Sequence, residues 1–297
     1  MLYQQISQNK RRTFYVLLLF FILTSLVGGA IGYLFAHNFI IGVIAALIIT
    51  LIYSIISINN SIDTIMKLNS AHEITNINDD RYKELKNVIS DMALVARIPM
   101  PRIFIINDDS PNAFATGNNP NNSAIAVTSG LLNIMNRDEL EGVIGHEVSH
   151  IRNYDIRLQT ISLALTSAIS LLVNFGSQFL WNLGFDEDNN DSSNNLFIIF
   201  ISIILIILGP LASTIAQMAL SRNREFLADA GSVELTRNPQ ELINALKKLD
   251  KTEPMKKVNS SSSALYISDP IKKDSWWNHL FDTHPSISKR IKRLENM

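Results

Sequence analysis

Two histidines with an acid between them stand near the middle of the sequence, in the run His146-Glu147-Val148-Ser149-His150. If this run is helical, histidines four positions apart share one face and lie about 6 Å apart along the axis, so both imidazoles can bind one metal ion. Glu147 projects roughly 100° round the helix from His146, so its carboxylate can reach a water molecule without occupying a coordination position. This arrangement predicts a metal site with Glu147 as its general base.

The residues before the histidines have the features of a helix. Acids stand at its start, where the helix dipole favours negative charge, and Leu140, Val143 and Ile144 have the spacing of a core-facing surface. The motif is therefore expected on a helix, as its geometry requires. A catalytic zinc site also needs a third protein ligand and an open position for water.

Glu225 and Asp229 are the best candidates to complete the site. They are one helical turn apart, so Glu225 can bind the metal while Asp229 accepts a hydrogen bond from a ligand histidine. A solvent-exposed charged helix face is the alternative, since runs of charge usually have that role. Because the sequence has no cysteine, thiolate ligands and disulfides are excluded, and zinc must be held by histidine and carboxylate groups.

The composition indicates a membrane protein. Of the 297 residues 47% are hydrophobic and only 18% are charged, which is more apolar than an ordinary soluble domain. Uncharged runs occupy residues 14–36, 39–58, 158–181 and 196–220. The first run would extend about 35 Å as a helix, enough to cross a hydrocarbon core of about 30 Å. The runs predict two transmembrane hairpins, with a buried helical hairpin as the alternative for the second pair, which is diluted by serine and threonine.

The positive charges are distributed on one side of this topology. All 26 Lys and Arg residues lie outside residues 13–58 and 158–221. The positive-inside rule therefore predicts a multi-pass protein of the cell membrane with its N-terminus, catalytic domain and C-terminus in the cytoplasm. The net charge of −1 and the lack of a long basic block argue against a nucleic-acid surface, and we expect neither nucleic acid nor nucleotide as a partner.

The expected fold is an α+β membrane protein, with about four transmembrane helices and a mostly helical catalytic domain that contains a small β-sheet. Its predicted parts are an N-terminal transmembrane hairpin (1–58), the first part of the catalytic domain (59–157), a second pair of membrane helices (158–220) and the second part of the catalytic domain (221–297).

The soluble parts carry weaker patterns. Residues 80–98 have helical periodicity, residues 103–106 and 123–128 are typical of short strands, and residues 238–249 and 287–297 are typical of helices. The small-residue stretch 111–117 between the two strands is either the edge of a sheet, which could accept an extended peptide, or a plain loop.

Several features together resemble HtpX-type membrane zinc metalloproteases of the gluzincin group, which are related to the CAAX prenyl proteases. They are the hairpin after residues 9–12, the Asn112-to-Gly117 stretch, the histidine motif followed by Asp155, the run Ser221-Arg222-x-x-Glu225-x-x-Ala228-Asp229, and Thr283-His284-Pro285. The resemblance covers the chain from end to end. It implies a zincin-like endopeptidase of membrane-protein quality control with one zinc ion per subunit. It also implies Glu225 as third ligand and a substrate-binding edge strand that includes Asn112, Ala113, Phe114 and Ala115.

His284 is the expected oxyanion donor. Tyr154 follows His150 on the same helix, whereas an oxyanion donor must face the metal from across the substrate. A structural histidine beside a helix-starting proline is the alternative for His284.

The predicted function is hydrolysis of peptide bonds in misfolded or damaged membrane proteins from the cytoplasmic side, in quality control and stress response. A zinc-binding membrane scaffold without activity is the alternative. Glu147 distinguishes the two, because a structural site needs no base and would supply a fourth protein ligand.

Overall fold

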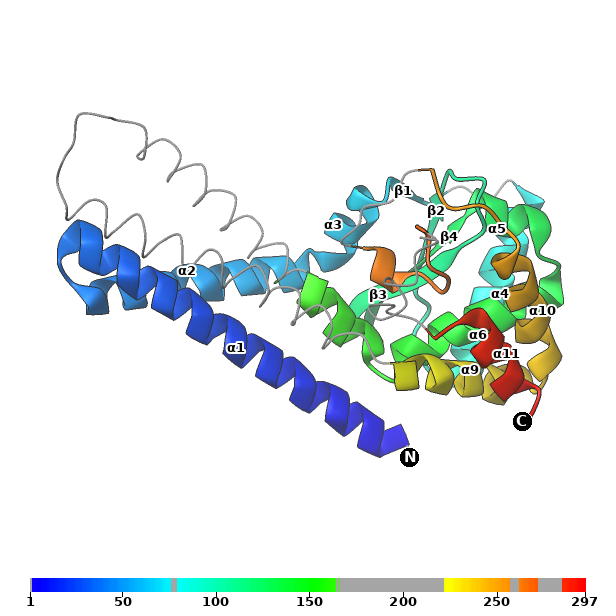
Figure 1. The fold of residues 1–297 in the computed structure, drawn as a ribbon. Helices are drawn as coiled ribbons and strands as arrows, with labels where there is room; N and C mark the ends of the chain where they lie inside the picture. The colour runs from blue at the N-terminus through cyan, green and yellow to red at the C-terminus, as the bar shows by residue number, and fades with distance from the viewer. Residues whose placement is uncertain (1, 76–78, 164, 166–221, 257–261, 272–284) are drawn as a thin grey trace. The chain divides into compact units, whose positions relative to one another are not determined.

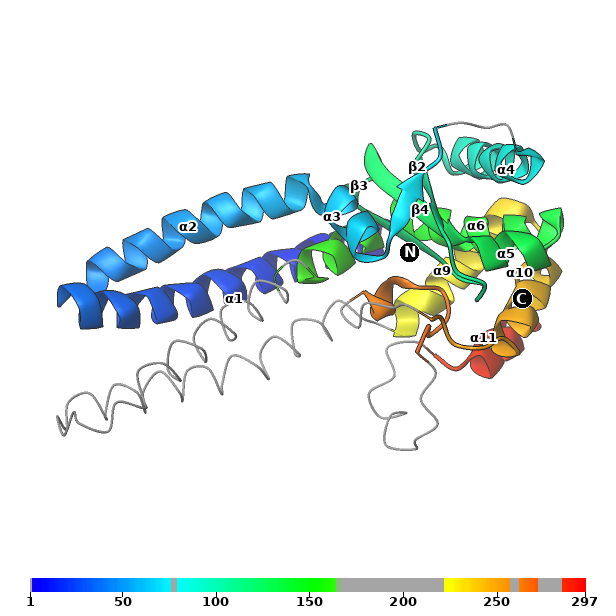
Figure 2. The ribbon, with the colours of Figure 1, turned by 90° about the horizontal axis from the view of Figure 1, so that it is seen from above.

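A computed structural model of the chain describes residues 2–75, 79–163, 165, 222–256, 262–271 and 285–297 (Figure 1, Figure 2). The chain divides into two compact units. One unit comprises Arg11–Ile58 and Ile161–Ala219, and the other comprises Met1–Lys10, Asn59–Thr160 and Leu220–Met297. The first contains the N-terminal apolar hairpin, and the second contains the histidine motif.

Two long helices form most of the described part of the hairpin unit, although residues 1–10 belong to the other unit. Helix α1 spans Leu2–Ala36 and helix α2 spans Phe39–Asn59 (Figure 1). Segments Arg11–Gly29 and Phe39–Asn59 are long and apolar enough to cross a membrane. Their many exposed aliphatic side chains are typical of helices that face lipid. The protein therefore has the two candidate membrane helices that the sequence predicted for its N-terminal part.

Small residues bring α1 and α2 close together. A methyl group added at Gly32 would lie 2.4 Å from the Cα of Gly42, and one added at Gly28 would lie 2.1 Å from the Cβ of Ala46. Glycines four apart on one helix commonly permit such close approach in membranes. Any side chain at Gly28 or Gly32 would force the two helices apart.

The other unit contains a four-stranded sheet. Its strands are β1 (Ala71–Glu73), β2 (Arg102–Ile106), β3 (Ala113–Asn119) and β4 (Asn122–Thr128), in the order β1-β2-β4-β3. The pair β2 and β4 is parallel, and the other two pairs are antiparallel. β3 is therefore an edge strand, and of the two alternatives for residues 111–117 the strand edge is correct for Ala113 onward.

Helices pack around this sheet (Figure 1, Figure 2), and most residues of the hydrophobic core lie on them. They are α3 (Ser61–Leu68), α4 (Asp80–Ala96), α5 (Ser129–Ile134), α6 (Arg137–Arg152), α9 (Arg222–Thr236), α10 (Pro239–Asp250) and α11 (Ile287–Leu294), with a short 3-10 turn, η1, at Ser263–Leu265. The predicted helices at 80–98, 238–249 and 287–297 are α4, α10 and α11, and the two predicted strands are β2 and β4. Helix α6 is central, because it packs against β3, α4, α9 and α10.

Helix α6 begins at a reciprocal cap. The side chain of Asn136 accepts a hydrogen bond from the backbone N–H of Glu139 at 2.8 Å, and the carboxylate of Glu139 accepts one from the N–H of Asn136 at 2.9 Å. Such a capping box satisfies two amide groups that the first helical turn cannot. Lys248 of α10 also donates to Glu139, at 2.5 Å. The start of the motif-bearing helix is thus fixed both locally and against α10.

Glycines let the neighbouring helices approach α6 closely. A Cβ at Gly142 would lie 2.6 Å from the backbone nitrogen of Leu242 in α10, and one at Gly145 would lie 2.9 Å from Oγ of Ser232 in α9. The Ser232 hydroxyl donates to the carbonyl of Gly142 at 2.6 Å. These contacts set the separation between α6, which carries the histidines, and α9, which carries the predicted third ligand.

Candidate active site

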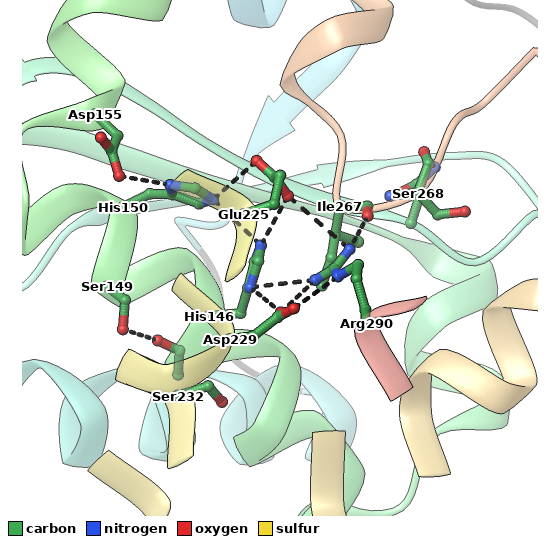
Figure 3. A network of polar contacts seen from close by, with 12 residues as sticks. His146, Ser149, His150, Asp155, Glu225, Asp229, Ser232, Ile267, Ser268 and Arg290 are labelled. Atoms are coloured by element: carbon green, nitrogen blue, oxygen red, sulfur yellow. Dashed lines mark hydrogen bonds and ion pairs between the residues drawn. The ribbon is translucent and has the colours of Figure 1, made fainter. Parts of the chain in front are cut away.

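The side chains of His146, His150 and Glu225 meet in one buried place (Figure 3). The Nε2 atoms of the two histidines are 3.2 Å apart. Glu225 Oε2 lies 3.6 Å from Nε2 of His146, and its Oε1 lies 3.6 Å from Nε2 of His150. Ligand atoms around a tetrahedral zinc ion, at bond lengths of about 2.0–2.1 Å, are about 3.3 Å apart. The three groups therefore have the separations that one metal ion of this size requires.

The orientation of the two imidazoles also supports metal binding. Nδ1 of His146 lies 3.0 Å from Oδ1 of Asp229, and Nδ1 of His150 lies 3.0 Å from Oδ2 of Asp155 (Figure 3). A carboxylate at each Nδ1 accepts its proton in a hydrogen bond, which leaves the lone pairs of the two Nε2 atoms facing each other. Lone pairs at 3.2 Å repel unless a cation lies between them. The donor set thus suits a metal ion.

The electrostatics of His146 point the same way. Burial and the nearby charge of Arg290 lower its pKa, but the carboxylates of Asp229 and Glu225 raise it more, to about 9. This imidazole is therefore strongly attractive to positive charge, whether a proton or a metal ion.

Glu147 is buried beside this set, with its side chain 1% exposed. Burial raises the pKa of its carboxyl, while the charges of His146 and His150 and the backbone N–H of Ala115 act to lower it. Its Oε1 accepts no hydrogen bond from the residues that the structure describes. A carboxyl with a raised pKa and an oxygen available to a water molecule has the properties of a general base.

Asp229 lies where the sequence predicted it, beside His146, and it has a second partner. Nε of Arg290 donates to its Oδ2 at 3.0 Å, and Nη2 donates to its Oδ1 at 2.6 Å. Burial raises the pKa of Asp229, but the charge of Arg290 and the hydrogen bond to His146 lower it more, so the carboxylate stays ionised. The orienting role that we predicted for Asp229 is compatible with this geometry.

Sequence reasoning assigned no role to two residues of this site, Asp155 and Arg290. Asp155 follows Tyr154, whose φ of 62° lies in the left-handed region, and this turn after α6 brings the carboxylate back to His150. The available signal was an acid shortly after the second histidine. For Arg290 the signal was its place on the helical face that Ile287 and Leu294 also occupy.

The predicted substrate-binding strand divides into two parts. At its start, the carbonyl of Ala113 accepts a hydrogen bond from the N–H of Ile267 at 2.9 Å. Asn112 brackets Ser268, because its Nδ2 donates to the Ser268 carbonyl at 2.9 Å and its Oδ1 accepts from the Ser268 N–H at 3.3 Å. Asn112 and Ala113 are thus engaged by a segment of the same chain.

The second part of the strand turns toward the site. The backbone N–H of Ala115 faces the carboxylate of Glu147 and acts to lower its pKa. Phe114 is fully buried, and its ring packs edge-on against Tyr266, with ring centroids 4.9 Å apart. This contact holds the strand in place. The edge from Ala115 onward therefore lies nearest the predicted base.

Two predicted features lie outside the described residues. One is His284, for which we predicted the oxyanion role. The other is most of the third and fourth uncharged runs, residues 166–181 and 196–220. The oxyanion role and the four-helix topology stay predictions.

The chain is similar over its whole length to known proteins. The profile of Peptidase family M48 matches residues 79–297. Proteins called "Protease HtpX homolog" from Limosilactobacillus reuteri (strain DSM 20016) and Leuconostoc citreum (strain KM20) are 58% and 55% identical, over 100% of both chains in each case. The crystal structure of S. mikatae Ste24p superposes with a TM-score of 0.49 at 19% identity, covering 94% of this chain but only 62% of that one. The family match and the full-length relatives show that the chain belongs to peptidase family M48 and is a metalloprotease of the HtpX type that its sequence resembles.

Proposed function

We propose that the protein is an integral-membrane zinc endopeptidase in which His146, His150 and Glu225 bind the ion and Glu147 is the general base. The observation that carries this proposal is the triangle of buried ligand atoms, 3.2 to 3.6 Å on each side, next to a buried carboxylate with an available oxygen. Two imidazoles and one carboxylate are a common ligand set of catalytic zinc, and they leave a position open for water.

Each residue around the proposed ion has a separate role in peptide hydrolysis. When bound, zinc polarises the scissile carbonyl and lowers the pKa of water to about 7. Glu147 accepts the proton of the attacking water at Oε1 and passes it to the leaving amine. Asp229 and Asp155 hold the Nδ1 protons of the two histidines, so that both Nε2 lone pairs face inward. His284 supplies the oxyanion donor in this proposal.

The substrate in this proposal is an extended peptide that pairs with the outward edge of β3 at Ala115, the part of the predicted stretch Asn112 to Ala115 that follows the residues engaged by Ile267 and Ser268. Alternate residues of an antiparallel strand turn their backbone groups away from their partner. The carbonyl of Asn112 accepts from the N–H of Thr128 at 2.9 Å, so by this alternation Phe114 faces β4 while Ala113 and Ala115 face outward, as the bond from Ile267 to Ala113 also indicates. Backbone pairing of this kind tolerates many side chains. We therefore expect weak sequence preference.

The biological substrates that we propose are misfolded or damaged membrane proteins, cut from the cytoplasmic side of the cell membrane. The distribution of Lys and Arg supports this orientation. The two candidate membrane helices support a location in the bilayer.

One assay tests the proposal directly. The full-length protein is purified in detergent, loaded with zinc and incubated with an unfolded protein substrate, beside Glu147→Gln and a control, Asp138→Asn. Asp138 is an exposed acid in the first turn of the same helix. We expect cleavage by the wild type and the control but not by Glu147→Gln, with stoichiometric zinc in all three. Equal zinc content without cleavage by any of them would instead support the inactive scaffold.

A further inference from the structure

Arg290 is buried at the metal-ligand set although its guanidinium is charged. The side chain, which α11 carries, is 1% exposed. Besides its two bonds to Asp229, its Nη1 donates to the carbonyl of Ile267 at 2.7 Å, and its Nη2 lies 3.3 Å from Nδ1 of His146 (Figure 3). Burial of an unpaired charge is strongly unfavourable, so a buried guanidinium needs close partners. The partners of Arg290 belong to the metal site and to the segment beside β3.

The guanidinium of Arg290 offsets negative charge at the site. Four buried carboxylates surround the two histidines, those of Glu147, Asp155, Glu225 and Asp229. Nη1 of Arg290 lies 3.9 Å from Oε2 of Glu225, and Nη2 lies 2.6 Å from Oδ1 of Asp229. Counting these groups alone, a zinc ion and one guanidinium bring the four negative charges to within one charge of neutrality. The arginine therefore offsets repulsion among the carboxylates that bind and orient the ligands.

The pairing is also directional. Arg290 bonds to both oxygens of Asp229, and a planar guanidinium held in this way fixes the plane of the carboxylate. Oδ1 of Asp229 is then held at the 3.0 Å contact with Nδ1 of His146. A lysine could supply the charge but not the fixed two-point contact.

The same side chain reaches the edge of the sheet. Ile267, whose carbonyl accepts from Arg290, donates its own N–H to the carbonyl of Ala113 at the start of β3. A continuous series of hydrogen bonds thus runs from His146 through Asp229, Arg290 and Ile267 to Ala113. It joins a predicted metal ligand to the strand on which we propose that the peptide binds.

We propose that Arg290 is a positioning residue that fixes His146 through Asp229 and holds β3 in register with the metal through Ile267. This inference rests on the proposed zinc peptidase function. A purely structural role, in which Arg290 only attaches α11 to the rest of the unit, is the competing explanation. The two differ in what they predict for zinc affinity and for KM.

The test uses the full-length protein in detergent, as wild type, Arg290→Ala, Arg290→Lys, Asp229→Asn and the control Lys289→Ala. Lys289 is the exposed neighbour of Arg290 on α11. Zinc affinity is measured by competition with a chromophoric chelator, which requires no substrate. We expect Arg290→Ala to bind zinc about 10- to 100-fold more weakly, the usual loss for a partner of a ligand histidine. Arg290→Lys should fall between the wild type and Arg290→Ala, and Lys289→Ala should match the wild type.

Two further measurements separate positioning from support of the fold. Methylguanidinium should restore part of the zinc affinity of Arg290→Ala and leave the other proteins unchanged. At saturating zinc, Arg290→Ala should keep a raised KM, whereas Asp229→Asn should recover the wild-type KM because its link from Arg290 to Ile267 remains. An unchanged KM in Arg290→Ala would overturn the connection to β3.

The outcomes also separate this inference from the proposed function. If the wild type binds zinc tightly and a folded Arg290→Ala binds it equally well, the positioning role is wrong and the zinc site stands. If the wild type itself binds no zinc, the proposed function fails. Should Arg290→Ala not fold, Arg290→Lys decides, and wild-type zinc affinity in that variant would contradict the two-point contact.

Discussion

At the scale of residues, the Nδ1 atoms of His146 and His150 have different surroundings. His150 has Asp155 at its Nδ1, while His146 has Asp229, a carboxylate that shares its charge with Arg290. A carboxylate partner fixes the ring orientation of a metal-binding imidazole, and a guanidinium bonded to both oxygens of that carboxylate fixes the carboxylate in turn. The orientation of His146 is therefore held by two successive partners, and that of His150 by Asp155.

Removal of the proposed ligands should separate metal binding from chemistry. We expect His146→Ala, His150→Ala and Glu225→Ala each to lose the metal, because two remaining ligands do not hold zinc in a catalytic site. Glu147→Gln should keep the metal and lose cleavage. Metal analysis of the four purified variants checks this expectation, and full zinc occupancy in Glu225→Ala would contradict the assignment of the third ligand.

The carboxylates that orient the histidines should matter to a smaller degree. Asp229→Ala and Asp155→Ala are each expected to lower zinc affinity or cleavage rate by about 10- to 100-fold rather than to abolish them. Glu234, a carboxylate of α9 that pairs with Arg152 away from the histidines, provides a control in Glu234→Ala. Wild-type affinity and rate in Asp155→Ala would show that its contact with His150 has no functional role.

The site was partly predictable from spacing alone. His146, Glu147 and His150 lie within five residues of one another, so helical geometry fixes their relation wherever the helix is placed. Glu225 and Asp229 also share one turn, and they needed only the assumption that their helix packs against the first. Arg290 comes from a third helix, and no local periodicity states which buried partner an arginine will reach.

At the scale of elements, close packing of helices determines the geometry of the ligands. Gly142 faces α10 at a separation that leaves no room for a side chain. Gly145 faces α9. The pattern of apolar residues predicted α4, β2 and β4 correctly, because α4 repeats them at helical spacing and the two strands are runs of apolar residues. Strand β1 has only three residues, which is too short to show an alternation, and it forms by pairing with β2.

A methyl group on α6 should disturb this packing. Gly142→Ala would bring a Cβ to 2.6 Å from backbone in α10, which cannot move away as a flexible side chain would. We expect a loss of about 1–3 kcal/mol in the free energy of unfolding, as is typical of overpacked sites. Thermal unfolding beside Lys247→Ala, an exposed change on α10, measures it. Equal stability of the two variants would show that α10 shifts at little cost.

The outward edge of β3 allows a sharper experiment. The N–H of Ala115 points away from β4 and toward Glu147, so Ala115→Pro removes an outward donor without breaking the ladder. We expect this variant to fold and bind zinc but to lose most of its kcat/KM for peptides. Ala115→Gly keeps the N–H and should stay active. Full activity in the proline variant would contradict peptide pairing at this position, and a loss confined to kcat with an unchanged KM would instead reflect the effect of this N–H on Glu147.

At the scale of the whole molecule, the chain combines two candidate membrane helices with a unit that carries the histidine motif and is assembled from separate stretches. The histidine motif and the third ligand stand on either side of the predicted second pair of membrane helices in the sequence. A catalytic unit interrupted in this way is expected to stay close to the bilayer. Flexible segments of membrane proteins, the substrates that we propose, would then be the most accessible to it.

Cut sites should reflect this location. We expect cleavage in flexible cytoplasmic segments of membrane proteins, with little sequence preference, because both the charge distribution and the edge-strand mode favour it. Mass spectrometry of cells that express the active and Glu147→Gln forms maps the cuts. Cuts confined to extracytoplasmic loops would reverse the predicted orientation, and one strict recognition sequence would contradict pairing through the backbone.

The bond between Arg290 and Asp229 also has a consequence for the order of synthesis. All three proposed metal ligands and Asp229 are made before Arg290, which follows Glu225 by 65 residues. At about 5–20 residues per second, the ribosome needs roughly 3–13 seconds to add that stretch. During this interval the growing chain holds its histidines and carboxylates without the guanidinium that completes their network. If Arg290 has the positioning role that we propose, the nascent chain is expected to bind zinc more weakly during this interval than the finished protein does.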